Sequence, residues 1–313
     1  MTGIYAENSE GIFKKSVLEA ASYASQISTE GVTAICIGSP NDGEADKLAK
    51  YGVTKLIIVE GLTAFDAQNY SKAIAANLAG IKTLVIANTY EGKALSPRVA
   101  VLMNASLATN VVALPDTSNG FVVKRGVFSG KGFAHVQLSR ENKIVAITPN
   151  SIELKESQAS IAVEKTSVSD SENLTKITAS NKAAGKIPLT EAEIVVSAGR
   201  GMKGPENWGM VEELAGLLGA ATACSKPVSD MDWRPHSEHV GQTGITIKPN
   251  LYIAIGISGA IQHLAGVSSS KVIVVINKDP EAPFFKAADY GIVGDAFEVM
   301  PKIIEAVKKL KQA

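Results

Sequence analysis

The apolar and polar positions in the first third of the chain alternate between two kinds of pattern. Short runs rich in β-branched residues fit strands, and they are TAICIGS (33–39), KLIIVEG (55–61), KTLVIANT (82–89) and NVVALPD (110–116). Longer segments have apolar residues at helical spacing, and they cover residues 16–26, 44–50, 65–78 and 97–109. Strands that alternate with helices predict a mainly parallel sheet that is covered on both faces.

The pattern changes near residue 120, where strand-like segments follow one another without a long helical segment between them. These segments are GFVVKRGVFSGKGFAHVQLS (120–139), NKIVAITPN (142–150) and ASIAVEKTSV (159–168). Glycine and polar turns separate them. We therefore expect an antiparallel extension of the same sheet.

The stretch from residue 166 to 193 is polar, so we place a domain boundary within it, near residue 190. Beyond it the alternation resumes, with strands at EIVVSAG (193–199), AATACS (220–225), LYIAIG (251–256) and KVIVVINK (271–278) and helices over 206–219 and 296–310. The sequence thus predicts an α/β protein with two domains. Residues 1–190 form a mostly parallel sheet with an antiparallel extension, and residues 191–313 form a doubly wound domain.

Charge and composition narrow the classes of partner. The 31 Lys and Arg residues balance the 31 Asp and Glu residues, which favours small-molecule or protein partners over nucleic acid or an anionic membrane. No apolar run reaches the roughly 18–20 residues that a membrane span needs. The two cysteines, Cys36 and Cys224, lie far apart beside strand-like segments, as buried free thiols do in a reducing compartment.

The first residues, MTGIYAENSE, have neither an apolar signal core nor the Arg-rich character of a transit peptide. We expect a bacterial cytoplasmic protein. The mitochondrial matrix is the alternative if a presequence has been removed.

A glycine turn follows the first strand of the second domain. Residues 199–204 (GRGMKG) have the G-x-G-x-x-G spacing that lets a pyrophosphate approach backbone N–H groups. The acid expected about 20 residues later on the ribose of a dinucleotide is missing, which weighs against an NAD dehydrogenase. The guanidinium of Arg200 can form a forked ion pair with a phosphate, although a solvated surface arginine is equally consistent with this segment alone.

Polar loops also follow the other strands of the second domain, and they are CSKPVSD (224–230), GISGAIQH (256–263), INKD (276–279) and GDAFE (294–298). Ligands of open α/β sheets bind at the carboxyl ends of the strands, so we expect these loops to meet the Arg200 turn at one crevice. They carry the kind of polar groups that bind nucleotides: Ser225, Ser258, Asn277 and Asp295. The Asp295 carboxylate can accept a hydrogen bond from a ribose hydroxyl or from an adenine amino group.

His263 follows a Gly-x-x-Gly turn at the predicted ligand edge, and its ring N–H can donate to a carbonyl oxygen. His236 and His239 lie in a polar, proline-containing loop and are predicted to be at the surface. Core or rim packing is the prediction for Trp208 and Trp233. The sequence has no serine–histidine–acid order, no paired catalytic carboxylates and no metal-ligand cluster, so the site is predicted to hold a ligand.

Four motifs in order, SAGRGMKG, CSKPVSD, VGQTGITIKPNLYIAIGISGAIQHLAG and VIVVINKDPEAPFFKAADYGIVGD, make the chain resemble the α subunit of electron transfer flavoproteins. Residues 191–313 carry nearly all of this resemblance. It implies FAD in the second domain and a heterodimer with a β subunit that carries AMP. It also implies an electron carrier without substrate turnover of its own, which accepts electrons from dehydrogenases such as acyl-CoA dehydrogenases and passes them to a membrane quinone reductase.

The resemblance also assigns residues to FAD. Arg200 would contact the phosphates, with Ser225 and Lys226 on the next loop. Along the flavin and the ribityl chain, the resemblance places Val240, Gly241, Gln242 and Thr243, with Thr243 near flavin N5. Around the pyrophosphate and ribityl region it places Ser258, Gly259, Ala260, Ile261, Gln262 and His263, with His263 on the flavin O2 side. At the adenosine end it places Asn277, Asp295 and Ala296. Together, His263 and Lys226 are expected to stabilise negative charge on the reduced ring.

The chain departs from the family at Lys226, where many members have an arginine. A guanidinium can stack on the flavin ring and an ammonium cannot, so the positive charge is kept but the ring contact is not implied. Two alternatives stay open: an NADH-linked, electron-bifurcating relative, and an interaction subunit without a cofactor.

Overall fold

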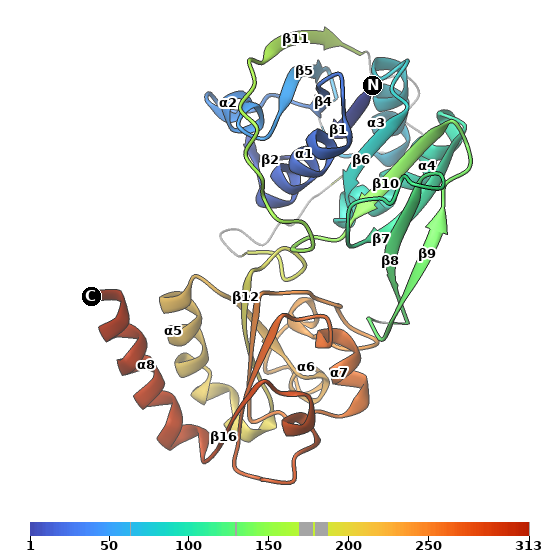
Figure 1. The fold of residues 1–313 in the computed structure, drawn as a ribbon. Helices are drawn as coiled ribbons and strands as arrows, with labels where there is room; N and C mark the ends of the chain where they lie inside the picture. The colour runs from blue at the N-terminus through green and yellow to red at the C-terminus, as the bar shows by residue number, and fades with distance from the viewer. Residues whose placement is uncertain (63, 129, 169–177, 179–186, 313) are drawn as a thin grey trace. The chain divides into compact units, whose positions relative to one another are not determined.

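The computed structural model describes residues 1–62, 64–128, 130–168, 178 and 187–312 (Figure 1). The chain divides into two compact units. The first unit comprises Met1–Val127 and Phe133–Lys182, and the second comprises Phe128–Gly132 and Ala183–Ala313. Most of the polar stretch 166–193, in which we expect the domain boundary, lies outside the described residues.

The first unit is built on a nine-stranded sheet with the order β11-β5-β4-β1-β6-β10-β7-β8-β9. Its strands are β1 (Thr2–Tyr5), β4 (Val32–Ile37), β5 (Val53–Glu60), β6 (Thr83–Ala87), β7 (Ala105–Val111), β8 (Val122–Val127), β9 (Gly132–Gln137), β10 (Asn142–Ile147) and β11 (Ala162–Ser167). Its helices are α1 (Lys15–Ile27), α2 (Glu44–Ala49), α3 (Ala67–Asn77) and α4 (Tyr90–Leu102), and a short hairpin joins β2 (Asn8–Ser9) to β3 (Ile12–Phe13).

Two separate hydrophobic cores cover the faces of this sheet. Val17 of α1 and Leu48 of α2 belong to one core, and Ile74 of α3 and Val99 of α4 belong to the other. All four side chains are almost fully buried. The predicted parallel sheet with both faces covered is therefore confirmed.

The antiparallel extension is confirmed only next to β7, which pairs with β8 in antiparallel orientation. The prediction was wrong for the two later strands. Asn142–Ile147 (β10) lies in the middle of the sheet, parallel to β6 and β7, and Ala162–Ser167 (β11) pairs in parallel with β5. The four consecutive buried residues of β10, Ile144 to Ile147, fit a strand that is covered on both faces.

The predicted helix over 97–109 was also wrong in its position. The helix α4 begins seven residues earlier, at Tyr90, because Thr89 caps it by accepting a hydrogen bond from the Gly92 N–H (3.0 Å). Pro97 lies inside the helix. Asn104, in the left-handed region (φ 49°), follows the helix, and the strand β7 begins at once.

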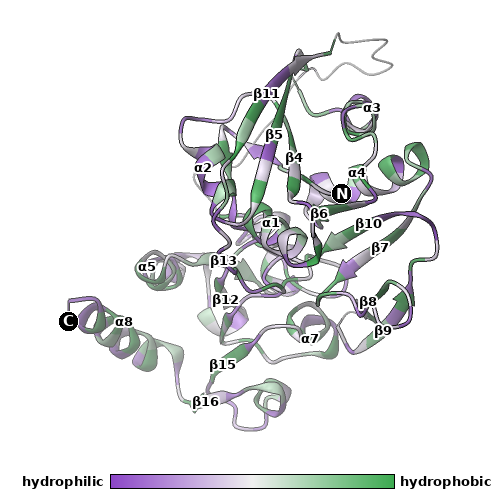
Figure 2. Cartoon of the chain, turned by 45° about the horizontal axis from the view of Figure 1, so that its top comes forward, coloured by the Kyte–Doolittle hydropathy of each residue, from purple (hydrophilic) through white to green (hydrophobic). Residues whose placement is uncertain are grey.

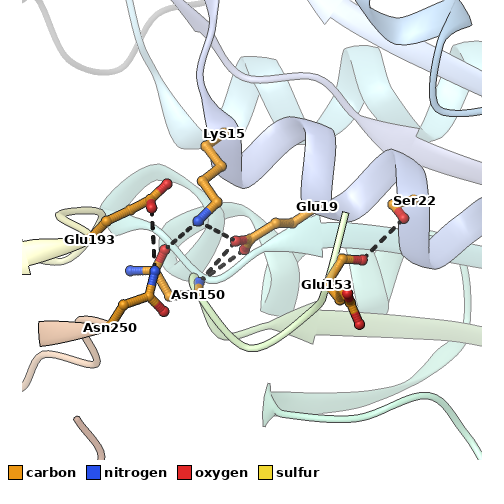
Figure 3. Close-up of polar contacts among 7 residues, drawn as sticks. All are labelled: Lys15, Glu19, Ser22, Asn150, Glu153, Glu193 and Asn250. Atoms are coloured by element: carbon orange, nitrogen blue, oxygen red, sulfur yellow. Dashed lines mark hydrogen bonds and ion pairs between the residues drawn. The ribbon is translucent and has the colours of Figure 1, made fainter. Parts of the chain in front are cut away.

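The turn after β10 is held by side chains of α1 (Figure 3). Both carboxylate oxygens of buried Glu19 accept from the Asn150 N–H (3.2 and 2.9 Å), and the Lys15 ammonium donates to Asn150 Oδ1 (3.3 Å). Asn150 has a left-handed backbone (φ 60°). These bonds fix the end of a central strand from a helix more than 120 residues earlier in the chain.

The second unit has a parallel five-stranded sheet with the order β13-β12-β14-β15-β16. Its strands are β12 (Ile194–Ala198), β13 (Ala221–Cys224), β14 (Leu251–Ile255), β15 (Val272–Asn277) and β16 (Tyr290–Val293). Its helices are α5 (Gly209–Leu218), α6 (Lys226–Asp230), α7 (Ile261–Val267) and α8 (Ala296–Gln312), and four short 3₁₀ helices, η1 (Arg200–Met202), η2 (Pro205–Asn207), η3 (His236–Glu238) and η4 (Pro283–Ala287), join them.

Helices α5 and α8 lie on one side of this sheet and α7 lies on the other (Figure 1). The core on the α5 side contains Val211 and Met300, and the core on the α7 side contains Val267 and Phe284. In Figure 2, α8 carries both hydrophobic and hydrophilic residues, as a helix with one buried face does. The predicted doubly wound second domain is confirmed.

The direction of winding changes at β12. The chain goes from β12 to β13 on one side and then returns to place β14 on the other side of β12. The carboxyl ends of β12 and β14 therefore form the switch point of the sheet, where open α/β folds bind their ligands.

Candidate functional site

A cavity of about 850 Å³ opens at the carboxyl ends of the strands of the second unit. The turn after β12, the loop after β13, the turn after β14 and the loop after β15 all contribute to its wall. Twelve of the sixteen residues that the resemblance assigns to FAD line it: Arg200, Ser225, Lys226, Val240, Gly241, Gln242, Thr243, Ser258, Ala260, Gln262, His263 and Asn277. The predicted convergence of loops on one crevice is thus observed for the Arg200, Ser225, Ser258 and Asn277 loops.

Backbone lies directly against backbone at the switch point. The Gly201 N–H donates to the Gly256 carbonyl (3.1 Å), and Gly256 itself has a left-handed backbone (φ 59°). A Cβ on Gly201 would lie 2.6 Å from the Gly256 Cα, and one on Gly199 would lie 2.4 Å from the Gly256 oxygen. Only residues without a side chain allow the two strand ends to approach this closely.

The turn of residues 241–244 packs against α7 in the same way. The Gln242 N–H donates to the Gln262 carbonyl (2.7 Å), and a Cβ on Gly266 would lie 2.5 Å from the Gly241 nitrogen. This contact brings the Gln242–Thr243 turn beside the segment that leads to His263. Glycines therefore bring main chain close together at two places beside the cavity.

The cavity carries an excess of positive charge. Four cationic residues line it, Arg200, Lys203, Lys226 and Lys278, together with two carboxylates, Asp230 and Asp279. Lys203 is held near Asp295 (Nζ to Oδ2, 3.7 Å). Among the described residues, the Arg200 guanidinium forms no ion pair, so it is available for an anionic ligand such as a phosphate.

His263 is buried (7% exposed) with one ring nitrogen bonded and one free. Its Nε2 lies 2.7 Å from the Tyr252 hydroxyl, whereas Nδ1 has no hydrogen-bond partner among the described residues. Burial first, and nearby His239 second, lower the pKa of His263 to about 4. The imidazole is therefore neutral at pH 7, so its effect on a ligand is that of a hydrogen-bond donor, and the cationic charge in the cavity comes from the lysines and arginine.

Four of the assigned residues do not line the cavity. Gly259 (φ 81°) packs against Phe284, the Ile261 side chain is exposed, and Ala296 is buried at the start of α8. Asp295 precedes α8, where its Oδ1 accepts from the Phe297 N–H (2.9 Å). This hydrogen bond is the main cause that lowers the pKa of Asp295, whereas desolvation acts in the opposite direction.

The surface prediction was wrong for His239, which is buried (5% exposed) and lines the cavity. Its ring lies beneath the glycine turn, since a Cβ on Gly244 would meet its Nδ1 at 2.8 Å. The nearby glycines were the only signal in the sequence that the turn covers a side chain. His236 is exposed as predicted, and its Nδ1 lies 3.0 Å from the Ser229 hydroxyl.

Ion pairs fix the loop that precedes His239. Arg234 Nε and Nη2 donate to the two carboxylate oxygens of buried Glu238 (2.8 Å each), and Nη1 donates to Glu212 of α5 (2.8 Å). The guanidinium also lies over the Trp208 ring, 5.6 Å from its centroid. Trp208 is buried, as predicted.

We expect Arg234→Ala to lower the free energy of unfolding by about 2–3 kcal/mol, because the substitution leaves the Glu238 carboxylate buried without its cation. Urea denaturation followed by circular dichroism measures the change. Lys309→Ala is the matched control, since Lys309 pairs with Glu305 at the surface and the expected change is below about 1 kcal/mol. Equal changes for the two variants would contradict a special role for Arg234.

The described part of the chain contains no group of three or more His, Cys, Asp or Glu side chains that could hold a metal ion. Cys36 and Cys224 are both free and buried, as predicted. Among the helices of the described residues, none is long and apolar enough to cross a membrane.

A doubly wound domain with a cationic cavity at its switch point is typical of proteins that bind dinucleotides. Comparison with known sequences narrows this class. The family profile described as "Electron transfer flavoprotein domain" matches residues 2–171, and "Electron transfer flavoprotein FAD-binding domain" matches residues 188–268. The chain belongs to the electron transfer flavoprotein α-subunit family.

Relatives match over nearly the whole chain. The electron transfer flavoprotein subunit alpha of Bacillus subtilis is 38% identical over 98% of this chain and 97% of its own length. That of Syntrophomonas wolfei is 37% identical over 98% of this chain and 99% of its own length. The protein FixB of Clostridium saccharobutylicum is 35% identical over 99% of this chain and 97% of its own length.

Proposed function

We propose that this chain is the FAD-binding subunit of a heterodimeric electron carrier, with the cofactor held in the switch-point cavity of the second unit. The observation that carries the proposal is a cavity whose lining combines an unpaired guanidinium, Arg200, with buried His263, whose Nδ1 has no hydrogen-bond partner among the described residues. A buried polar atom without a partner is costly, and a ligand carbonyl would remove that cost. A pyrophosphate would likewise complement the excess of cations.

The residues of the cavity fit FAD in three ways. The glycine turns after β12 and β14 allow close approach of a ligand to main-chain N–H groups, Arg200 offers a forked donor to phosphate, and His263 offers a donor to a ring carbonyl. When bound, FAD supplies the one-electron chemistry, and the protein tunes it. Lys226 contributes a positive charge near the flavin end but not the planar stacking of an arginine.

The partners follow from the family. Relatives of this chain carry the name "subunit alpha", and we propose a β subunit, with AMP bound to it, as the second half of the heterodimer. Acyl-CoA dehydrogenases are the proposed donors, and a quinone reductase of the respiratory chain is the proposed acceptor. This chain would carry electrons between them without turning over a substrate of its own.

An absorbance spectrum of the heterodimer, purified after co-expression with a β subunit, tests the proposal. Flavin bands near about 450 nm that persist through dialysis support it. A colourless heterodimer would identify an interaction subunit without a cofactor. Rapid NADH oxidation by the coloured heterodimer would instead identify the electron-bifurcating alternative.

We expect His263→Ala to lower the reduction potential of the first one-electron step. The variant removes one donor to the reduced ring, worth about 1–1.5 kcal/mol, and about 1.4 kcal/mol corresponds to about 59 mV for one electron. Reductive titration against a dye of known potential measures the shift. His135→Ala is the control, because His135 lies exposed on β9. If His263→Ala leaves the reduction potential unchanged, His263 does not have this role.

A further inference from the structure

Tyr252 lies behind His263, on the strand β14, and is fully buried. Its hydroxyl is 2.7 Å from His263 Nε2, the shortest polar contact of either side chain. Three rings pack around this contact. The centroid of His263 lies 6.1 Å from that of Tyr252 and 5.7 Å from that of Phe284, and the Phe284 ring meets the imidazole edge-on at 72°. The orientation of the imidazole is therefore fixed by packing.

A neutral imidazole has one nitrogen that donates and one that accepts, and the partner of one nitrogen decides which. Burial raises the pKa of Tyr252 well above its ordinary value, so the phenol keeps its proton. The Ser197 hydroxyl lies beside the phenol and lowers that pKa, although it makes no hydrogen bond of ordinary length with any described residue. Nε2 is therefore the one acceptor for the phenol proton within hydrogen-bond distance among the described residues.

The other ring nitrogen, Nδ1, makes no hydrogen bond with any described residue. The main chain of Val240 raises the pKa of His263, against the effect of burial, as a carbonyl that accepts from a ring N–H does. A proton on Nδ1 is therefore not taken up by a hydrogen bond of ordinary length within the described part of the chain.

We infer that Tyr252 is a positioning residue for His263: its hydroxyl donates to Nε2 and so places the imidazole proton on Nδ1 of a ring that lines the cavity. The inference deepens the proposed function, on which it rests, because it explains how a neutral histidine is kept in the one tautomer that can donate to a cofactor carbonyl. Without the phenol, Nε2 would compete for the proton, and the tautomers would mix.

Nitrogen-15 NMR of the heterodimer with ring-labelled histidine tests the inference. The long-range proton–nitrogen spectrum distinguishes the tautomers, and His263→Ala identifies the signals of His263 among the four histidines. We expect the proton on Nδ1 in the unmodified protein. A proton on Nε2 would overturn the inference, and this result does not depend on whether any variant folds.

Tyr252→Phe is expected to shift His263 toward a mixture of tautomers and to weaken the binding of reduced FAD about fivefold relative to oxidised FAD, as loss of about one hydrogen bond would. Tyr23→Phe is the matched control, because Tyr23 is also fully buried but its hydroxyl has no hydrogen-bond partner in the described part of the chain. An unchanged tautomer in Tyr252→Phe would overturn the inference. A colourless heterodimer with the proton still on Nδ1 would contradict the proposed function alone.

Discussion

Arg200→Ala is expected to weaken FAD binding by about 10- to 100-fold. The guanidinium lines the cavity without a carboxylate partner, and a charge-assisted hydrogen bond to phosphate contributes about 1.5–3 kcal/mol. Titration of the FAD-free heterodimer with FAD, followed by flavin fluorescence, measures the dissociation constant. The reduction potential should change little, because the phosphates lie far from the ring.

Two further variants test whether the loss of FAD affinity comes from the planar, forked donors of the guanidinium. Arg200→Lys keeps the charge but loses the planar fork, so its affinity should lie between those of Arg200→Ala and the unmodified protein. Arg98→Ala removes an exposed arginine from α4 and should have no effect. Full retention of FAD in Arg200→Ala, together with a shifted potential, would contradict the phosphate assignment.

Gly201→Ala is expected to lower the free energy of unfolding by about 3 kcal/mol. Its Cβ would lie 2.6 Å from the Gly256 Cα and 2.9 Å from the Gly256 oxygen, so the methyl group meets main chain that cannot move aside. Overpacking of this kind typically lowers the free energy of unfolding by about 1–3 kcal/mol. We expect the upper end of this range, because the new methyl group would collide with backbone atoms. Urea denaturation measures the loss, and FAD affinity should fall with it.

Gly216→Ala is the matched control. Gly216 lies within α5, and a Cβ there would meet nothing within 4 Å. Alanine is the better helix former by about 0.5–1 kcal/mol, so this variant should be more stable than the unmodified protein. Destabilisation by both substitutions to a similar degree would show that the contact between Gly201 and Gly256 is not the cause.

Much of the second unit could be predicted because several independent sequence signals, such as apolar runs and glycine turns, indicate the same strands and loops. The strand LYIAIG is uniformly apolar, as a strand covered on both faces must be, and the glycine at its end marks the close approach of backbone. The order of the strands in the sheet could not be predicted from any single segment of the sequence. It follows from which strands neighbour β12, and that depends on packing between residues far apart in the chain.

The first unit was harder to predict because its last strands return to distant parts of the sheet. Local pattern gave β10 and β11 as strands but could not tell that β10 inserts between β6 and β7. The strand β1 was not predicted, since the four residues TGIY are too few to establish a period, although they lie at the centre of the sheet. The burial of His239 was missed for a similar reason: the turn that covers it closes only against α7.

Contacts between glycines bring the strand ends together beside the cavity, whereas the charges of the cavity are on long side chains. Shape and electrostatics are therefore separable in this protein. Substitution of Lys226 or Lys278, which line the cavity, should retune the potential or the strength of binding without remodelling the wall. Substitution of Gly201, Gly256 or Gly266 should remodel the wall whatever its charge. Variation among homologues is thus expected to be concentrated in the cations, and a designer who seeks a different potential should begin there.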